Sequence, residues 1–136
     1  MKKTLTVVFA ALCVLALFTG CAGGYDGMWR CAYMDTGRDV MTAGDLAAVG
    51  SELYIDLRSG GSGTMTADGE TQRITWKLSG DRSAVLLTVN GEIEPFRIEG
   101  DGLVWTMDGV TVTFLREKSD AYREALATLS YQQLGE

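Results

Sequence analysis

The chain has 136 residues, of which 46% are hydrophobic and 22% are charged, and its formal net charge is −6 at pH 7. This length fits one domain, and the hydrophobic fraction is too high for a disordered protein. The sequence contains no histidine, which excludes a Ser-His-Asp triad, a Cys-His dyad and any imidazole ligand to a metal. We therefore expect neither a metal nor another cofactor, and no enzyme of these common kinds.

The first 24 residues have the pattern of an export signal followed by a lipid attachment site. Two lysines precede an apolar run from Leu5 to Phe18, which is shorter than a typical membrane-spanning helix. The run leads into Thr-Gly-Cys at Cys21, which resembles the lipobox of bacterial lipoproteins. The resemblance implies that residues 1–20 are a signal peptide, that Cys21 is acylated, and that residues 21–24 form a short tether. A plain signal peptide or an uncleaved anchor is the alternative.

Lipid attachment would place the protein on the extracytoplasmic side of a membrane of the cell envelope. Loss of residues 1–20 removes two lysines and no acidic residue, which takes the net charge from −6 to −8. A negative charge of this size repels nucleic acid. The expected partners are therefore the bilayer, through Cys21, and either a small apolar ligand or an envelope protein.

Three cysteines are present, but Cys13 leaves with the signal peptide and Cys21 is committed to the lipid. Cys31 alone cannot form an intrachain disulfide, so the hydrophobic core must hold the fold together. No histidine or lysine is next to Cys31 in the sequence to activate it as a nucleophile. We therefore interpret Cys31 as a buried structural residue.

From Gly27 onward, apolar and polar residues alternate and turn residues recur about every ten positions, which is typical of all-β folds. Eight strands are predicted, at residues 27–35, 52–58, 64–67, 72–78, 84–89, 92–98, 103–107 and 110–115. The links after the second strand are short, which favours antiparallel neighbours in a meander. Eight such strands can close into a barrel without a free edge.

Two positions inside this β region stand out. Asn90-Gly91 is the strongest hairpin signal, because both turn positions tolerate a positive φ angle. Pro95 cannot donate a hydrogen bond to a neighbouring strand, so it marks an edge, a bulge or a bend.

The longest internal connection, residues 36–51, contains a short predicted helix. Thr42 precedes Asp45 by three residues, as in a capping box, and the helix over residues 45–49 ends at Gly50.

A C-terminal helix is predicted from Ser119 or Asp120 to about Leu134, within residues 119–136. Its apolar stripe has helical spacing and consists of Tyr122, Ala125, Leu126 and Leu129. We expect this stripe to pack outside the barrel on apolar residues of the outer strand faces, namely Leu86, Val104 and Leu115. A partner-binding patch is the alternative.

The first predicted strand opens with a Gly-x-Trp motif, Gly27-Met28-Trp29. Followed by a long loop, seven more strands and a terminal helix, this motif resembles the lipocalin-like superfamily, and in particular small bacterial lipoproteins with a lipocalin-like domain. The resemblance implies that residues 25–118 form the barrel, that Trp29 plugs its closed end, and that Arg116 lies against the indole ring. It also implies that residues 36–51 cover the mouth of the barrel.

Two functions fit such a fold. The residues expected to point inward are mostly bulky and apolar: Tyr33, Ile55, Met65, Ile74, Trp76, Leu87, Phe96, Trp105, Met107 and Phe114. In the first function, these side chains fill the barrel, and the domain acts by non-catalytic binding of another protein. In the alternative, they line a cavity for one small hydrophobic ligand, and the domain is a carrier or a sensor.

Three motifs with a superficial likeness to functional sites have simpler structural explanations. Glu92 and Glu94 share one strand face and suggest paired carboxylates, but beside a hairpin turn we expect them to keep an exposed edge soluble. Residues 99–102 lack the oxygen ligands of a calcium loop, and residues 60–63 lack the lysine of a phosphate-binding loop. The sequence therefore predicts no catalytic residue and no metal site.

Overall fold

The computed structural model describes residues 24–129 of the chain. The predicted signal peptide, the predicted acylation site Cys21 and the end of the predicted C-terminal helix lie outside this range. The described elements are β1 (Gly27–Asp35), β2 (Val40–Thr42), α2 (Ala43–Ala48), β3 (Leu53–Leu57), β4 (Ser62–Ala67), β5 (Glu70–Leu78), β6 (Ala84–Val89), β7 (Glu92–Glu99), β8 (Gly102–Met107), β9 (Val110–Arg116) and α3 (Asp120–Leu126). Within residues 24–129, neither helix has the length and apolar character needed to cross a membrane.

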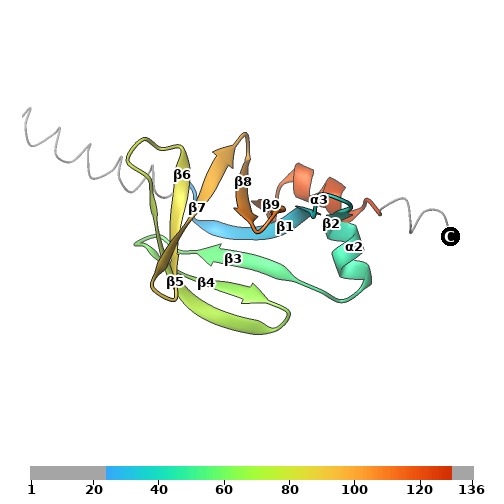
Figure 1. The fold of residues 1–136 in the computed structure, drawn as a ribbon, viewed down its shortest axis with the longest axis horizontal. Helices are drawn as coiled ribbons and strands as arrows, with labels where there is room; N and C mark the ends of the chain where they lie inside the picture. Colours follow the sequence, from blue (N-terminus) through green and yellow to red (C-terminus); the bar gives the residue numbers. More distant parts are fainter. Residues whose placement is uncertain (1–23, 130–136) are drawn as a thin grey trace, which may run out of the picture.

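Eight of the strands form a closed antiparallel barrel in meander order. Strands β3 to β8 each pair with the next one along the chain, and β1 closes the barrel by pairing with both β3 and β9. Figure 1 shows the strands of opposite walls crossing steeply, as the tilt of a small barrel requires. The predicted eight-stranded meander barrel with a C-terminal helix outside it is confirmed. The predicted strand bounds agree with the structure to within two residues.

The core lies inside the barrel and is built from alternate residues of every strand. Ile55, Leu87, Phe96 and Phe114 are completely buried, and the rings of Phe96 and Phe114 lie 5.7 Å apart. A barrel of eight strands has an interior just wide enough for side chains to fill. The hydrophobic core therefore occupies the space that a ligand would need.

The strand β1 contains a bulge that reverses the direction of its last side chains. Cys31 pairs with Phe114 and Tyr33 with the preceding Thr113, which leaves Ala32 as the extra residue. Tyr33 was predicted to point inward, but this prediction is wrong, since its side chain is 36% exposed. Met34 packs against the core in its place.

The connection between β1 and β3 contains one element that the sequence did not predict. The short strand β2 extends the sheet by pairing with the last three residues of β1. The helix α2 then begins with the predicted capping box, in which the Thr42 hydroxyl accepts from the Asp45 N–H and the Asp45 carboxylate accepts from the Thr42 N–H. Leu46 of α2 packs against the barrel core.

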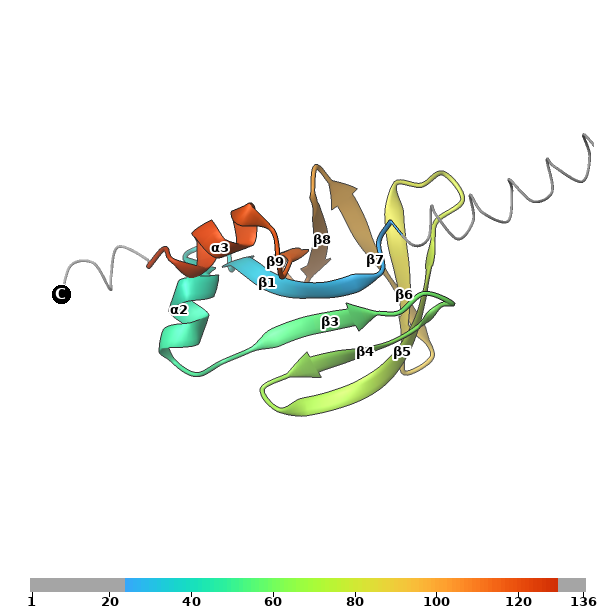
Figure 2. The same ribbon diagram turned by 180° about the vertical axis from the view of Figure 1, so that it is seen from behind.

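The helix α3 lies outside the barrel beside α2, as both views of the fold show (Figures 1 and 2). It ends at Leu126, so the predicted extension through Leu129 is wrong. It covers one of the three outer-face residues predicted beneath it, Leu115. Its buried contacts form a cluster of Ala32, Ala43, Leu115, Tyr122 and Ala125. Leu86 and Val104 are not in this cluster, because a helix of seven residues is only about 10 Å long.

Candidate functional site

The interior offers packed side chains rather than a cavity lining. Of the residues predicted to point inward and to surround a ligand, seven are buried in one cluster: Ile55, Met65, Ile74, Trp76, Leu87, Phe96 and Phe114. The Trp76 indole N–H is satisfied by the backbone carbonyl of Arg58 at 2.9 Å. Tyr33 lies on the outer face of β1, Met107 is 48% exposed, and Trp105 is half-buried. Binding surfaces are therefore to be sought at the ends and on the outside of the barrel.

At the end where β1 begins, which we call the closed end after the lipocalin resemblance, Trp29 is 1% exposed and Arg116 covers it. The guanidinium lies 4.4 Å from the centre of the indole ring, the arrangement that the lipocalin resemblance implies. A cation over an indole contributes about 0.5–2 kcal/mol. The indole N–H donates to the Tyr25 carbonyl at 2.9 Å, and Arg116 donates to the Asp26 carbonyl at 2.9 Å and to the Gly24 carbonyl. These contacts hold residues 24–26 against the barrel.

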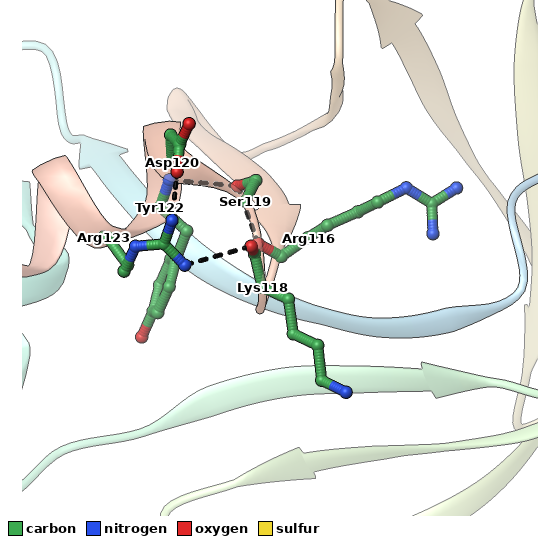
Figure 3. Close-up of polar contacts among 6 residues, drawn as sticks. All are labelled: Arg116, Lys118, Ser119, Asp120, Tyr122 and Arg123. Atoms are coloured by element: carbon green, nitrogen blue, oxygen red, sulfur yellow. Dashed lines mark hydrogen bonds and ion pairs between the residues drawn. The ribbon is translucent and has the colours of Figure 1, made fainter.

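A cleft of about 800 Å³ lies beside this pair. Its walls include Gly24, Trp29, Arg82 and Arg116, together with the first residues of α3. Figure 3 shows how α3 begins there: the Ser119 hydroxyl accepts from the Tyr122 N–H at 3.0 Å and donates to the Arg116 carbonyl at 2.8 Å. Gly24, the first described residue, also lies on the wall of this cleft, so the chain enters the described domain there.

The first turn of α3 is also held by a second set of contacts. Arg123 forms an ion pair with Asp120 and donates to the Lys118 carbonyl (Figure 3). In the same view the Arg116 side chain points away from α3 and extends along β1. The Arg116 backbone carbonyl thus bonds the N-cap residue of α3, and the guanidinium of the same residue covers Trp29.

A second space, of about 510 Å³, lies between the two helices and the barrel wall. Arg30 bonds Glu117 there at 2.9 Å, and its guanidinium lies 4.6 Å from the centre of the Tyr54 ring. Burial raises the pKa of Cys31 from 9.0 to about 12, so the thiol stays protonated at neutral pH. Burial also raises the pKa of Tyr122, against the opposing effect of the Arg30 charge. A protonated, 3% exposed thiol has no nucleophilic character.

At the opposite end, which we call the open end and where β1, β4, β6 and β8 finish, two carboxylates, Glu92 and Glu94, lie on the inner face of β7, and the second of them is bonded. Glu94 lies opposite Leu87 on the inner face of β7, and its Oε1 accepts a hydrogen bond of 3.1 Å from the Trp105 indole N–H. Trp105 in turn stacks on Phe96 at 5.1 Å. The expectation that Glu94 only keeps an edge soluble is therefore wrong. The signal was available in the sequence, because Glu94 is in phase with the inward Phe96.

The barrel is not hydrogen-bonded along its whole wall at this end. Strands β7 and β8 pair only from Arg97 with Val104 to Glu99 with Gly102. Residues 92–96 and 105–107 continue as strands without pairing to each other, and we call these two segments the β7–β8 split. Pro95 explains it, because this residue has no N–H to donate. Of the edge, the bulge and the bend that the sequence leaves open at Pro95, the register shows an unpaired edge on the β8 side.

Charge is distributed unequally between the two ends. Within residues 24–129, the strand ends and turns of the open end carry one basic residue, Arg38, and eight acidic ones: Asp35, Asp39, Glu52, Asp68, Glu70, Glu92, Glu94 and Asp108. The closed end mixes both signs, with Arg58, Arg82, Arg116 and Lys118 against Asp26, Asp81, Glu99, Asp101 and Glu117. The net negative charge of the domain is therefore concentrated at the open end.

No protein-family model, no curated protein and no solved structure matches this chain. Within residues 24–129, no group of three or more cysteine, aspartate or glutamate side chains is arranged to hold a metal ion. Function is therefore inferred from the barrel interior, its two ends and the β7–β8 split.

Proposed function

We propose that this chain is a lipid-anchored extracytoplasmic protein whose lipocalin-like barrel acts by non-catalytic binding on its outer surface. The observation that carries this proposal is the filled interior, in which Ile55, Leu87, Phe96 and Phe114 have no exposed surface. A close-packed core leaves no space for a ligand without a rearrangement. The alternative, a carrier of a small hydrophobic ligand inside the barrel, would require these side chains to move apart.

The position of the tether supports a definite orientation on the membrane. Gly24 lies at the closed end, on the wall of the cleft beside Trp29. An acylated Cys21 is three residues away, a distance of roughly 10 Å at full extension. The closed end, with its mixed charges, would then be close to the bilayer, and the acidic open end would point away from the anionic lipid surface.

Metabolic labelling of the full-length protein with palmitate, in its own cell type, tests the anchor. We expect the label to be lost in Cys21→Ser and kept in Cys13→Ser, because Cys13 leaves with the signal peptide. Label that persists in Cys21→Ser would contradict the proposal. The matched Cys13 variant separates lipid attachment from any general effect of removing a cysteine.

Native mass spectrometry of the mature protein, purified from the same cells, tests the binding mode. A mass equal to that of the acylated chain supports a filled barrel that binds at its surface. An additional small mass that is lost on denaturation supports the carrier instead, and its value gives the ligand class.

A further inference from the structure

We propose that the β7–β8 split is a docking site for an extended, basic segment of a partner protein, which adds as a strand to the free edge of β8. This inference rests on the proposed function only in requiring that the open end face away from the bilayer. The site lies in the barrel wall at the open end and leaves the buried hydrophobic core in place.

The hydrogen-bonding pattern identifies which backbone groups are available. The Ile98 N–H donates to the Ser83 carbonyl on the β6 side. The backbone N–H and C=O groups of the even-numbered residues of β7 therefore point toward β6, and those of the odd-numbered residues point toward β8. Arg97 accordingly pairs with Val104. The next such pair would be Pro95 with Thr106, and Pro95 cannot donate. The N–H and C=O of Thr106 therefore face β7 with no ladder partner across the split.

The side chains around this edge define the chemistry of the partner. Glu92 and Glu94 lie on the inner face of β7, and Asp108 follows β8 directly. Ile93 and Met107 are 60% and 48% exposed and supply apolar surface beside the carboxylates. A strand presents alternate side chains to opposite faces, so a segment that alternates basic and apolar residues matches both features. Peptide recognition by strand addition takes its affinity from backbone hydrogen bonds and its specificity from such alternate contacts.

Charge also argues against other occupants of this edge. Nucleic acid, anionic lipid and a second copy of this acidic chain would all be repelled by the eight carboxylates of the open end. A small polycation would be attracted by the carboxylates but has no backbone to pair with Thr106. The predicted partner is therefore a basic polypeptide segment in extended conformation.

Fluorescence anisotropy at low salt tests the proposal with a labelled peptide that alternates lysine and valine. We expect this peptide to bind the mature protein, and a glutamate–valine peptide of the same length to show no binding. The double variant Glu92→Gln, Glu94→Gln should weaken binding about tenfold, which corresponds to roughly 1.4 kcal/mol. Glu99→Gln, on the same strand at the closed end, is the matched control and should leave the affinity unchanged.

The backbone contribution is tested separately with a lysine–valine peptide that is N-methylated at alternate residues, and so cannot form a strand ladder. We expect a loss of binding, and Thr106→Pro should have the same effect on the unmodified peptide. Equal affinity for the methylated and the unmodified peptide would overturn strand addition. An equal loss of affinity in the Glu92→Gln, Glu94→Gln variant and in Glu99→Gln would overturn the location of the site. Neither result would affect the palmitate labelling, so failure of this inference is distinguishable from failure of the lipid anchor.

Discussion

At the closed end of the barrel one polar side chain, Arg116, is bonded to the chain itself over the core, whereas at the open end most carboxylates are exposed. Arg116 bonds two backbone carbonyls there and covers Trp29. At the open end, Trp105 is only half-buried and bonds Glu94, one of two carboxylates on the inner face of β7. The first arrangement stabilises the fold, while the second leaves hydrogen-bonding edges and charge available to a partner. Substitutions that separate stability from binding test this division.

The largest difference in stability should come from the two tryptophans. Trp29→Ala removes a side chain that is 1% exposed, so we expect a loss of about 3–5 kcal/mol of unfolding free energy. Trp105→Ala removes a half-buried ring and should cost about half as much. Urea unfolding of both variants measures the difference. Equal losses would mean that the open end is as essential to the core as the closed end.

Gly44 tests whether the helical layer packs as tightly as the barrel. A Cβ at this position would lie 2.3 Å from the Thr128 carbonyl oxygen and 2.6 Å from that of Leu126. Because both are backbone atoms, Gly44→Ala must displace the end of α3, at a cost of about 1–3 kcal/mol. Gly80→Ala meets no atom within 4 Å and serves as the control in thermal unfolding. No difference between the variants would show that the end of α3 moves freely.

The sequence predicts the barrel well because alternation and turn residues are local signals. It gives no warning of the bulge at Ala32, because a bulge inserts one extra residue that carries no distinctive local signal here, and so it places Tyr33 on the wrong face. The strand β2 is too short to show a pattern and depends on its pairing with β1. The helical period of the C-terminal stripe continues to Leu129. However, Thr128 ends the helix, because its hydroxyl donates to the Glu124 carbonyl and its carbonyl accepts from the Thr42 hydroxyl.

The candidate site was harder to predict than the fold. Pro95 indicated an edge, but only the register shows that the ladder stops at Arg97. The sequence predicts that Glu94 keeps an exposed edge soluble, because this residue lies beside the Asn90-Gly91 hairpin turn. Its bond to Trp105 depends on the approach of two strands, which alternation alone does not give.

A smaller effect is expected from the cation that covers Trp29. Arg116→Met keeps part of the packing but removes the charge above the ring and the hydrogen bonds to residues 24 and 26. We expect a loss of about 0.5–2 kcal/mol. Arg38→Met, the matched change at the open end, alters an exposed side chain and should leave the unfolding midpoint unchanged at a salt concentration that screens the surrounding carboxylates. A loss of similar size in Arg38→Met would show that charge alone, rather than the contact with Trp29, sets the effect.

The smallest effect concerns two exposed carboxylates, one at each end. Hydrogen bonds from the Glu52 N–H and the Ser51 hydroxyl lower the pKa of Asp68 below its ordinary 3.8. The hydroxyl and N–H of Ser83, with the Ser79 hydroxyl, lower the pKa of Asp81 in the same way. A lowered pKa in the folded state contributes stability above the unfolded pKa, and this stability is lost as the pH falls through the folded value. Both Asp68→Asn and Asp81→Asn should therefore flatten the acid side of the stability profile.

The two variants should nevertheless differ at neutral pH. Asp68 lies among the carboxylates of the open end, so its neutralisation also relieves repulsion, whereas Asp81 has Arg82 beside it. We therefore expect Asp68→Asn to destabilise less than Asp81→Asn at low salt, and the difference to shrink as salt screens the repulsion. Urea midpoints at two salt concentrations measure this. A larger loss of stability for Asp68→Asn than for Asp81→Asn at low salt would contradict this expectation. It would mean that the hydrogen bonds of Asp68 stabilise the fold by more than the repulsion among the open-end carboxylates destabilises it.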